Sequence, residues 1–277
     1  MSPAIESELS VIPSLLPLSQ GQLTLLDACA RKYQYIYRDG LTVPIGYEQQ
    51  ARIDWGHQFH QLMQQQALGL PIEPLVAAEP EMMASFTALR QTAPDLFTPA
   101  APGVFRQSEH RRTRVFKNYL LTAIYDQVIL APGQAEIIDW KTHLTPPPRS
   151  RLQQDWQLRL YLYVLAETSQ LPPEQISMTY WFVRHRDPQT QELVPTSSRF
   201  SYDLQRHRQT EQDLERLTER LNQLRLQAEA FPKVERSRGL CSSCAFSLRC
   251  DRMDQPFDLV LQAARQITPK TVAEIAL

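Results

Sequence analysis

Residues 118–142, NYLLTAIYDQVILAPGQAEIIDWKT, contain two β-strand patterns on either side of one turn. Both runs are rich in β-branched and aromatic residues, which favour strands. Between them, Pro132 and Gly133 suit the two central positions of a type II turn. A hairpin closed by this turn places Asp126 directly opposite Asp139.

The two facing aspartates predict a cation site. Like charges opposite each other destabilise a sheet, so such carboxylates are solvated, share a proton or bind a cation. Lys141 shares the face of Asp139, whereas Trp140 points to the other face, toward the core. Oxygen ligands that leave coordination positions free suit Mg²⁺ or Mn²⁺. The lysine could orient a water molecule or stabilise charge on a phosphate. Alternatively, Asp139 and Lys141 form a surface ion pair without a catalytic role.

The composition is that of a folded globular chain. Of the 277 residues, 43% are hydrophobic and 21% are charged, which excludes a disordered or collagen-like polymer. The net charge of -1 excludes binding to nucleic acid through overall positive charge, so a polyanion site must be local. We see no apolar stretch that could span a bilayer and no signal peptide, and expect a cytoplasmic protein without a membrane partner.

The order of the patterns predicts a mixed α/β fold in a single domain, because helices flank a central run of strands. The expected helices cover 25–40, 48–68, 80–92, 150–167 and 204–230. The expected strands cover 104–116, 118–130, 135–142, 177–185 and 198–203. We expect an irregular lead-in over 1–19, the domain over 20–255 and a tail over 256–277.

Two pairs of residues four apart lie on predicted helices. Gly56 and His60 share one helix face, where glycine indicates close approach of another group and histidine is a potential metal ligand. Gln157 and Tyr161 share a face of an otherwise apolar helix and could bind a substrate backbone. The plainer alternatives are a histidine in the core or in solvent, and a glutamine and tyrosine that pair with each other.

The cysteines follow a C-x2-C-x5-C pattern near the C-terminus, with one more far upstream. They are Cys29, Cys241, Cys244 and Cys250. A zinc ribbon normally uses two local pairs, whereas three local thiols and one remote thiol suit a cubane iron–sulfur cluster. The alternatives are a buried Cys29 beside a partial site, or an unrelated α/β protein stapled by zinc.

These elements in this order resemble the RecB-like branch of the PD-(D/E)xK nucleases, in particular the Cas4-like and AddB-like iron–sulfur nuclease domains. The resemblance covers about residues 20–255. The matching residues, in chain order, are Cys29, Gly56, His60, Asp126, Asp139, Trp140, Lys141, Gln157, Tyr161, Cys241, Cys244 and Cys250.

The resemblance implies a restriction-endonuclease-like core, a central mixed sheet flanked by helices, with an iron–sulfur staple joining the two ends of the domain. It implies Mg²⁺ or Mn²⁺ held by His60, Asp126, Asp139 and the backbone carbonyl of Trp140. Lys141 would be catalytic together with the two aspartates, and Gln157 and Tyr161 would contact DNA or support the site, as would Gly56. Glu109 would be an auxiliary acid. The four cysteines would carry a [4Fe-4S] cluster that stabilises the fold.

The predicted function is metal-dependent hydrolysis of DNA, as an exonuclease on single-stranded ends in repair, recombination or CRISPR adaptation. No phosphate-binding loop of the G-x-x-x-x-G-K-[ST] type occurs, so a helicase or a CRISPR adaptation protein would be a separate partner. The alternative is a catalytically silent DNA-binding module that acts with a helicase. Tyr161 and Trp156 could stack on bases. The candidate cations for a DNA path are Arg111, Arg112, Arg114, Lys117, Arg149, Arg151, Arg184 and Arg186.

Overall fold

The computed structural model describes residues 15–43, 45–77, 79–227 and 229–253. The predicted tail over 256–277 and most of the lead-in lie outside these residues. The contacts divide the chain into two compact units. We call residues 1–24 with 45–220 the sheet unit, and residues 25–44 with 221–277 the cysteine unit.

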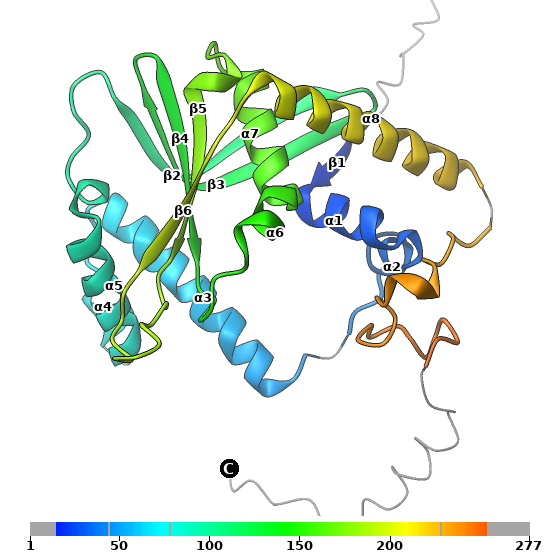
Figure 1. Cartoon of the computed structure of the whole chain (residues 1–277), viewed down its shortest axis with the longest axis horizontal. Coiled ribbons are helices and arrows are strands. Elements are labelled where there is room, and N and C mark those ends of the chain that lie inside the picture. Colours follow the sequence, from blue (N-terminus) through cyan, green and yellow to red (C-terminus); the bar gives the residue numbers. More distant parts are fainter. Residues whose placement is uncertain (1–14, 44, 78, 228, 254–277) are drawn as a thin grey trace, which may run out of the picture. The chain divides into compact units, whose positions relative to one another are not determined.

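A mixed six-stranded sheet forms the sheet unit, as the sequence predicts (Figure 1). Its strands are β1 (Leu16–Ser19), β2 (Phe105–Phe116), β3 (Tyr119–Ala131), β4 (Gln134–Lys141), β5 (Ile176–Phe182) and β6 (Thr196–Ser201). The order is β1-β3-β4-β5-β6, and β2 also pairs with β3. β1 runs parallel to β3 and β4 runs parallel to β5, while the other pairs are antiparallel. The sequence interpretation missed β1, which is too short to show a period.

The central hairpin has the register that its turn predicts. Leu130 pairs with Ala135, and Gln127 pairs with Ile138. Gly133 has a φ of 75°, as the third position of a type II turn requires. The pairing of β3 with β4 stops one step before Asp126 and Asp139.

The pairing of β2 with β3 is interrupted at the same level. Ser108 pairs with Gln127 and His110 pairs with Tyr125, but the intervening pair of Glu109 and Asp126 is absent from the ladder. Glu109 has a φ of 49°, in the left-handed region that residues with a Cβ rarely adopt. The register is the same on both sides, so this is a local break without an inserted residue.

Helices pack on both sides of the sheet (Figure 1). In the sheet unit they are α3 (Tyr47–Ala67), α4 (Glu73–Val76), α5 (Pro80–Thr92), η2 (Pro94–Leu96), α6 (Arg149–Gln154), α7 (Trp156–Thr168) and η3 (Pro173–Gln175). α1 (Gln20–Ala28) and α8 (Leu204–Leu226) each run from one unit into the other. The cysteine unit adds α2 (Ala30–Tyr33), η1 (Gln34–Arg38) and η4 (Arg236–Arg238).

The two faces of β4 meet different helices. Ile138 and Trp140 pack with Trp55 and Phe59 of α3 in one buried cluster, which confirms the inward orientation of Trp140. On the other face, the Tyr125 hydroxyl donates to the carbonyl of Tyr161 in α7. Asp139 and Lys141 therefore face α7 while Trp140 anchors the strand in the α3 core.

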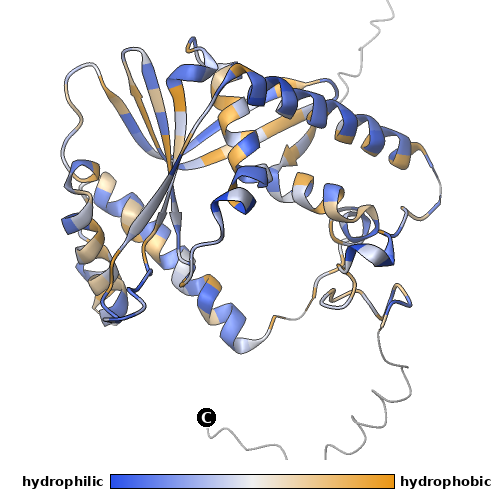
Figure 2. Ribbon diagram, viewed as in Figure 1, coloured by the Kyte–Doolittle hydropathy of each residue, from blue (hydrophilic) through white to orange (hydrophobic). Residues whose placement is uncertain are grey.

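The hydropathy of α8 matches a helix that lies on a surface. Its ribbon is blue along most of its length with separate orange residues (Figure 2). Leu214 and Leu217 within it are fully buried. None of the described helices is long and apolar enough to cross a bilayer.

The helix predicted over 150–167 is instead two helices, because Asp155 between them has an extended ψ of 133°. Its carboxylate accepts a hydrogen bond from the backbone N–H of Gln157 at 3.0 Å and caps α7. The break sets the start of α7 so that Gln157 stands in its first turn, facing β4.

The helix predicted from Leu25 to Gly40 is also broken. Cys29 is extended, with φ -160° and ψ 110°, and separates α1 from α2. A π-helical turn, η1, then follows and ends before Gly40, which has a φ of 65°. The stop at Gly40 is confirmed, but the continuous helix is wrong.

We expect the cap of α7 to be measurable in stability. Asp155→Ala should lower the free energy of unfolding by about 1 kcal/mol, because it leaves the Gln157 N–H without its acceptor. Asp155→Ser, which retains a capping oxygen, should recover most of the loss. Urea denaturation measures both values, and an alanine variant as stable as the wild type would contradict the capping role.

Candidate functional site

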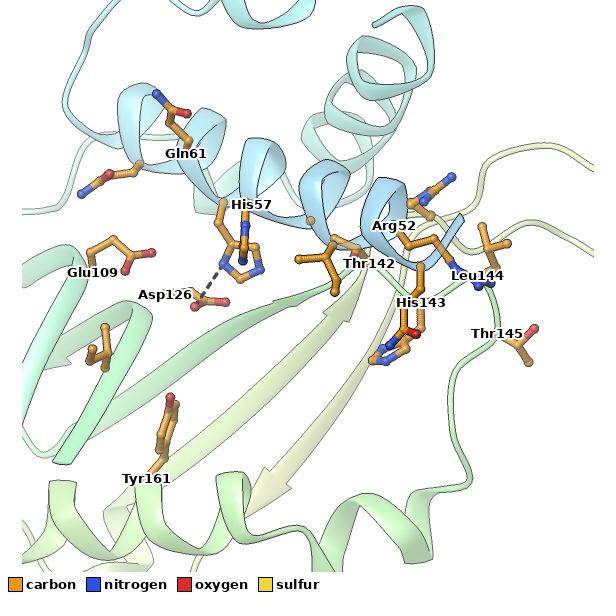
Figure 3. Close-up of a pocket in the computed structure, with 17 residues that line it drawn as sticks. Arg52, His57, Gln61, Glu109, Asp126, Thr142, His143, Leu144, Thr145 and Tyr161 are labelled. Carbon is orange, nitrogen blue, oxygen red and sulfur yellow. Dashed lines mark ion pairs between the residues drawn. The ribbon is translucent and has the colours of Figure 1, made fainter. Parts of the chain in front are cut away.

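A cleft of about 950 Å³ in the sheet unit lies where α3 passes the break in the strands. His60, Glu109 and Asp126 line it, and each offers one potential metal-ligand atom within 4.8 Å of the others. His60 Nδ1 lies 3.3 Å from Asp126 Oδ1. Figure 3 shows Glu109 and Asp126 on the same side of the cleft, below the α3 ribbon.

At the break in the strands, the Asp126 side chain accepts a hydrogen bond from a backbone N–H in place of a backbone carbonyl. Its Oδ2 accepts a hydrogen bond from the Trp140 N–H at 2.7 Å, just beyond the last residue pair of β3 with β4. One carboxylate oxygen thus fixes the two strands together, while the other faces His60. Its side chain is 12% exposed, so the cleft reaches it.

Asp139 and Lys141 form a closed network with Gln157. Lys141 Nζ lies 2.6 Å from Asp139 Oδ2 and donates to Gln157 Oε1 at 2.6 Å. Gln157 Nε2 donates in turn to Asp139 Oδ1 at 2.7 Å. The ammonium also lies 4.9 Å from the ring centre of Tyr180. Asp139 and Lys141 therefore form an ion pair as the alternative expected, but the pair is not on the surface, because the Asp139 side chain is only 2% exposed.

The electrostatics indicate an excess of negative charge. Burial raises the pKa of Asp139 to about 7, with a further contribution from the Asp126 charge and with Lys141 opposing it. Burial acts to lower the pKa of His60, but the hydrogen bond to Asp126 and the charges of Asp126, Asp139 and Glu109 outweigh it and raise this pKa. Burial and the Asp126 charge also raise the pKa of Glu109. A bound cation would relieve these interactions.

The donor set fits a divalent metal. One imidazole nitrogen and two carboxylates converge in His60, Glu109 and Asp126. Near them, Asp139 Oδ2 is buried and accepts no hydrogen bond of normal geometry, although Lys141 is close. Hard oxygen ligands combined with one imidazole suit Mg²⁺ or Mn²⁺ among the common ions.

The structure brings together a different trio from the one predicted. His60 and Asp126 meet as expected, but the third group within 4.8 Å is Glu109, the predicted auxiliary acid, and not Asp139. The backbone N–H of Trp140 donates a hydrogen bond to Asp126. Among the described residues, no contact of the Trp140 carbonyl identifies that carbonyl as a metal ligand.

Gly56 and Tyr161 also lie at the cleft. A Cβ on Gly56 would lie 3.3 Å from Thr142 Oγ1, so the expected close approach exists and its partner is a side chain. Tyr161 is 7% exposed, and burial raises its pKa, with a contribution from the Asp139 charge. Gln157 bonds to Asp139 and Lys141 and supports them.

Most of the basic residues predicted to contact DNA have hydrogen-bond or ion-pair partners within the protein. Several of the predicted cations bond within the protein: Arg112 to Thr168, Arg114 to Glu167, Lys117 to Glu215, Arg149 to the carbonyl of Arg199, Arg184 to Glu81 and Arg186 to the carbonyl of Gln191. Of the eight predicted cations, Arg184 alone lines the cleft. Trp156 is buried, with the Arg159 guanidinium over its ring, so stacking of Trp156 on a base is wrong.

Two cleft residues escaped the sequence interpretation. Arg52 and His143 line the cleft together with Arg184. Arg52 lies four residues before Gly56, and that spacing could have placed it on the same helix face. His143 follows β4 directly after Thr142, and no spacing rule points to it.

The four cysteines all belong to the cysteine unit and line one cavity of about 190 Å³. All four are free and partly buried. A zinc ion would draw its four sulfurs to about 3.8 Å from one another, but among the described residues no three of the sulfurs lie within 4.8 Å. The structure shows neither a closed zinc site nor a cluster-like arrangement, so the iron–sulfur staple is not shown.

The family model of the PD-(D/E)XK nuclease superfamily matches residues 17–251. The chain belongs to the PD-(D/E)XK nuclease superfamily. The motif of this family, as the sequence resemblance assigned it, falls on Asp126 and on Asp139-Trp140-Lys141 at the break in the hairpin. These residue roles and the RecB-like branch remain predictions.

A solved structure shares the fold of this PD-(D/E)XK nuclease. The chain is similar to the crystal structure of a candidate exonuclease from Eubacterium rectale, with 11% identity and a TM-score of 0.54. That alignment covers 95% of this chain and 99% of the other. The structure of SSO0001 aligns with 11% identity and a TM-score of 0.37, over 89% and 92% of the two chains. No curated protein matches the chain.

We expect Asp139→Asn to stabilise the metal-free protein at high pH. An acid whose pKa rises from 3.8 to about 7 on folding loses stability as the pH rises through that window, because the unfolded chain releases the proton first. Asparagine avoids this loss. In EDTA, the melting temperature of the variant relative to that of the wild type should rise from about pH 4 to about pH 7 and level off above it.

Asp95→Asn, at an exposed aspartate of η2, is the matched control and should show no such trend. A constant difference between Asp139→Asn and the wild type over this pH range would mean that Asp139 ionises normally in the folded protein.

Proposed function

We propose that this chain is a Mg²⁺- or Mn²⁺-dependent deoxyribonuclease of the RecB-like branch, acting as an exonuclease on single-stranded ends. Its setting would be repair, recombination or CRISPR adaptation in the cytoplasm, with a separate helicase or CRISPR adaptation protein as partner. The observation that carries the proposal is the group of His60, Glu109 and Asp126 in one cleft, next to the network of Asp139 with Lys141.

In this proposal His60, Glu109 and Asp126 hold the divalent ion, with Asp139 close enough to raise the local negative charge. When bound, the ion supplies charge neutralisation at the phosphate and makes water a stronger nucleophile. Lys141 presents a fixed positive charge beside the reacting phosphate. Gln157 and the Tyr180 ring hold that ammonium in place, so little reorganisation is needed during the reaction.

The cleft combines positive charge with apolar surface, which suits an unpaired strand. Arg52 and Arg184 line it and could contact phosphates. Ile124, which is 42% exposed, and Tyr161 offer apolar surface to bases. This combination supports single-stranded DNA as the substrate.

The nuclease assay uses oligonucleotides labelled at either the 5′ or the 3′ end, single- and double-stranded, with Mg²⁺ or Mn²⁺. We expect the wild type to shorten single strands progressively from one end. Asp126→Asn, Asp139→Asn and Lys141→Ala should each lower kcat by about 100-fold or more, because each removes charge that stabilises the transition state. Glu109→Gln should raise the half-saturating metal concentration by about tenfold.

Glu192→Gln, at an exposed glutamate that does not line the cleft, is the matched control for Glu109→Gln and should leave the metal dependence unchanged. DNA binding without any cleavage by the wild type would favour the silent module that acts with a helicase. Undiminished cleavage by Asp139→Asn would reject the assigned site.

We also propose that the four cysteines hold a [4Fe-4S] cluster within the cysteine unit. Their shared cavity and the number of thiols support it. Anaerobically purified protein should be brown, with about four iron and four sulfide ions per chain, and Cys241→Ala should lose this iron. Colourless protein with stoichiometric zinc would overturn the cluster, and Ser243→Ala in the same loop is the control.

A further inference from the structure

A second cavity, of about 610 Å³, lies beside the proposed metal group in the sheet unit. It is enclosed by the C-terminal half of α3, the loop that follows η2 and the first half of β2. Glu109 and Gln64 line both this cavity and the cleft, so they form the wall between the two spaces. A molecule in this cavity would lie next to a phosphate at His60 and Asp126.

Gln127 gives the cavity an unused hydrogen-bonding group. It lines the cavity and is only 4% exposed. Its Oε1 is buried without a partner, and no hydrogen bond of its carboxamide occurs among the described residues. A buried carbonyl oxygen without a partner costs free energy, which a ligand that donates a hydrogen bond to it would recover.

The rest of the lining favours a neutral, flat, polar-edged ligand. Phe97, Leu96 and Met63 provide apolar surface, and Phe97 is fixed edge-to-face against Phe86. The lining contains one arginine, Arg106, whose guanidinium donates to the carbonyls of Leu96 and Thr98. A phosphate would find no free cation in the described lining, whereas a nucleobase has both apolar faces and donor–acceptor edges.

We propose that this cavity is a subsite for the base of the nucleotide whose phosphate lies at the metal group, with the Gln127 carboxamide bonding to the edge of that base. The inference rests on the proposed nuclease function and adds the position of the terminal base. The volume lies within the range of roughly 300–1,000 Å³ found for small-molecule sites.

The test is titration calorimetry with dAMP, dCMP, dGMP and dTMP, and with inorganic phosphate as a second probe, in Mn²⁺. Gln127→Leu should weaken the binding of deoxynucleotides by about fivefold or more, because it removes a hydrogen bond, and leave phosphate binding unchanged. It should also leave the melting temperature no lower than that of the wild type, because the lost amide had no partner. Gln65→Leu is the control, because Gln65 lies in α3 between two residues that line the cavity but lines neither cavity itself.

Ala100→Trp provides a second variant, because this exposed loop residue lines the cavity and a large side chain there would fill it without disturbing the core. It should weaken nucleotide binding and raise KM for single-stranded ends with little change in kcat. The subsite would be overturned if nucleotides bound to both variants as tightly as to the wild type. It would also be overturned if nucleotides bound to the wild type no more tightly than inorganic phosphate. Wild-type protein that binds nucleotides through Gln127 but cuts no DNA would instead overturn the nuclease proposal and leave the subsite standing.

Discussion

The structure depends on one electrostatic constraint, which is that acidic groups are held close together where water is scarce. Asp139 is buried with its pKa raised to about 7, and the charge of Asp126 contributes to that rise. One ammonium, from Lys141, compensates only part of this charge. A fold selected for stability alone would replace such a group by an apolar one, so its presence points to a bound cation.

The break in the strands makes this arrangement possible. In a regular ladder the backbone groups around Asp126 would pair with each other, and the carboxylates of Glu109, Asp126 and Asp139, directly opposite one another on neighbouring strands, would lie on one face. Here the Asp126 side chain accepts the Trp140 N–H itself, and Glu109 adopts a left-handed conformation opposite it. The two carboxylates therefore converge on His60 of α3 while Asp139 remains on the α7 side.

The sequence could predict the parts of this site that obey a local period. The Pro-Gly turn predicted the register of the hairpin, and a spacing of four predicted that Gly56 and His60 share a face. Glu109 could not be recognised as the third group, because its position depends on a left-handed φ that no residue pattern encodes. The break at Asp155 lies inside a run of helix-forming residues, so only the cap geometry reveals it.

The intramolecular partners of the predicted cations could not be predicted for a different reason. Charge runs in β2 looked like a DNA surface, but their partners lie far away in sequence, as with Arg112 and Thr168 or Arg114 and Glu167. The sequence pattern does not predict ion pairs between elements that are distant in sequence, whereas a local turn predicts the pairing of a hairpin. β1 could not be predicted for the same reason, because its four residues form a strand only by pairing with β3, which lies far away in sequence.

Some of the buried polar side-chain atoms without hydrogen bonds lie at or behind the two cavities. Asp139 Oδ2 and the Tyr180 hydroxyl belong to the network behind the cleft, and Gln127 Oε1 and Arg106 Nε border the second cavity. Folded proteins leave few such atoms, because each one costs free energy that a partner would recover. The unsatisfied atoms of Gln127, Arg106 and Arg184 face the two cavities and are the ones that a bound molecule could reach, whereas those of Trp55, Ser85 and His185 belong to residues outside both linings.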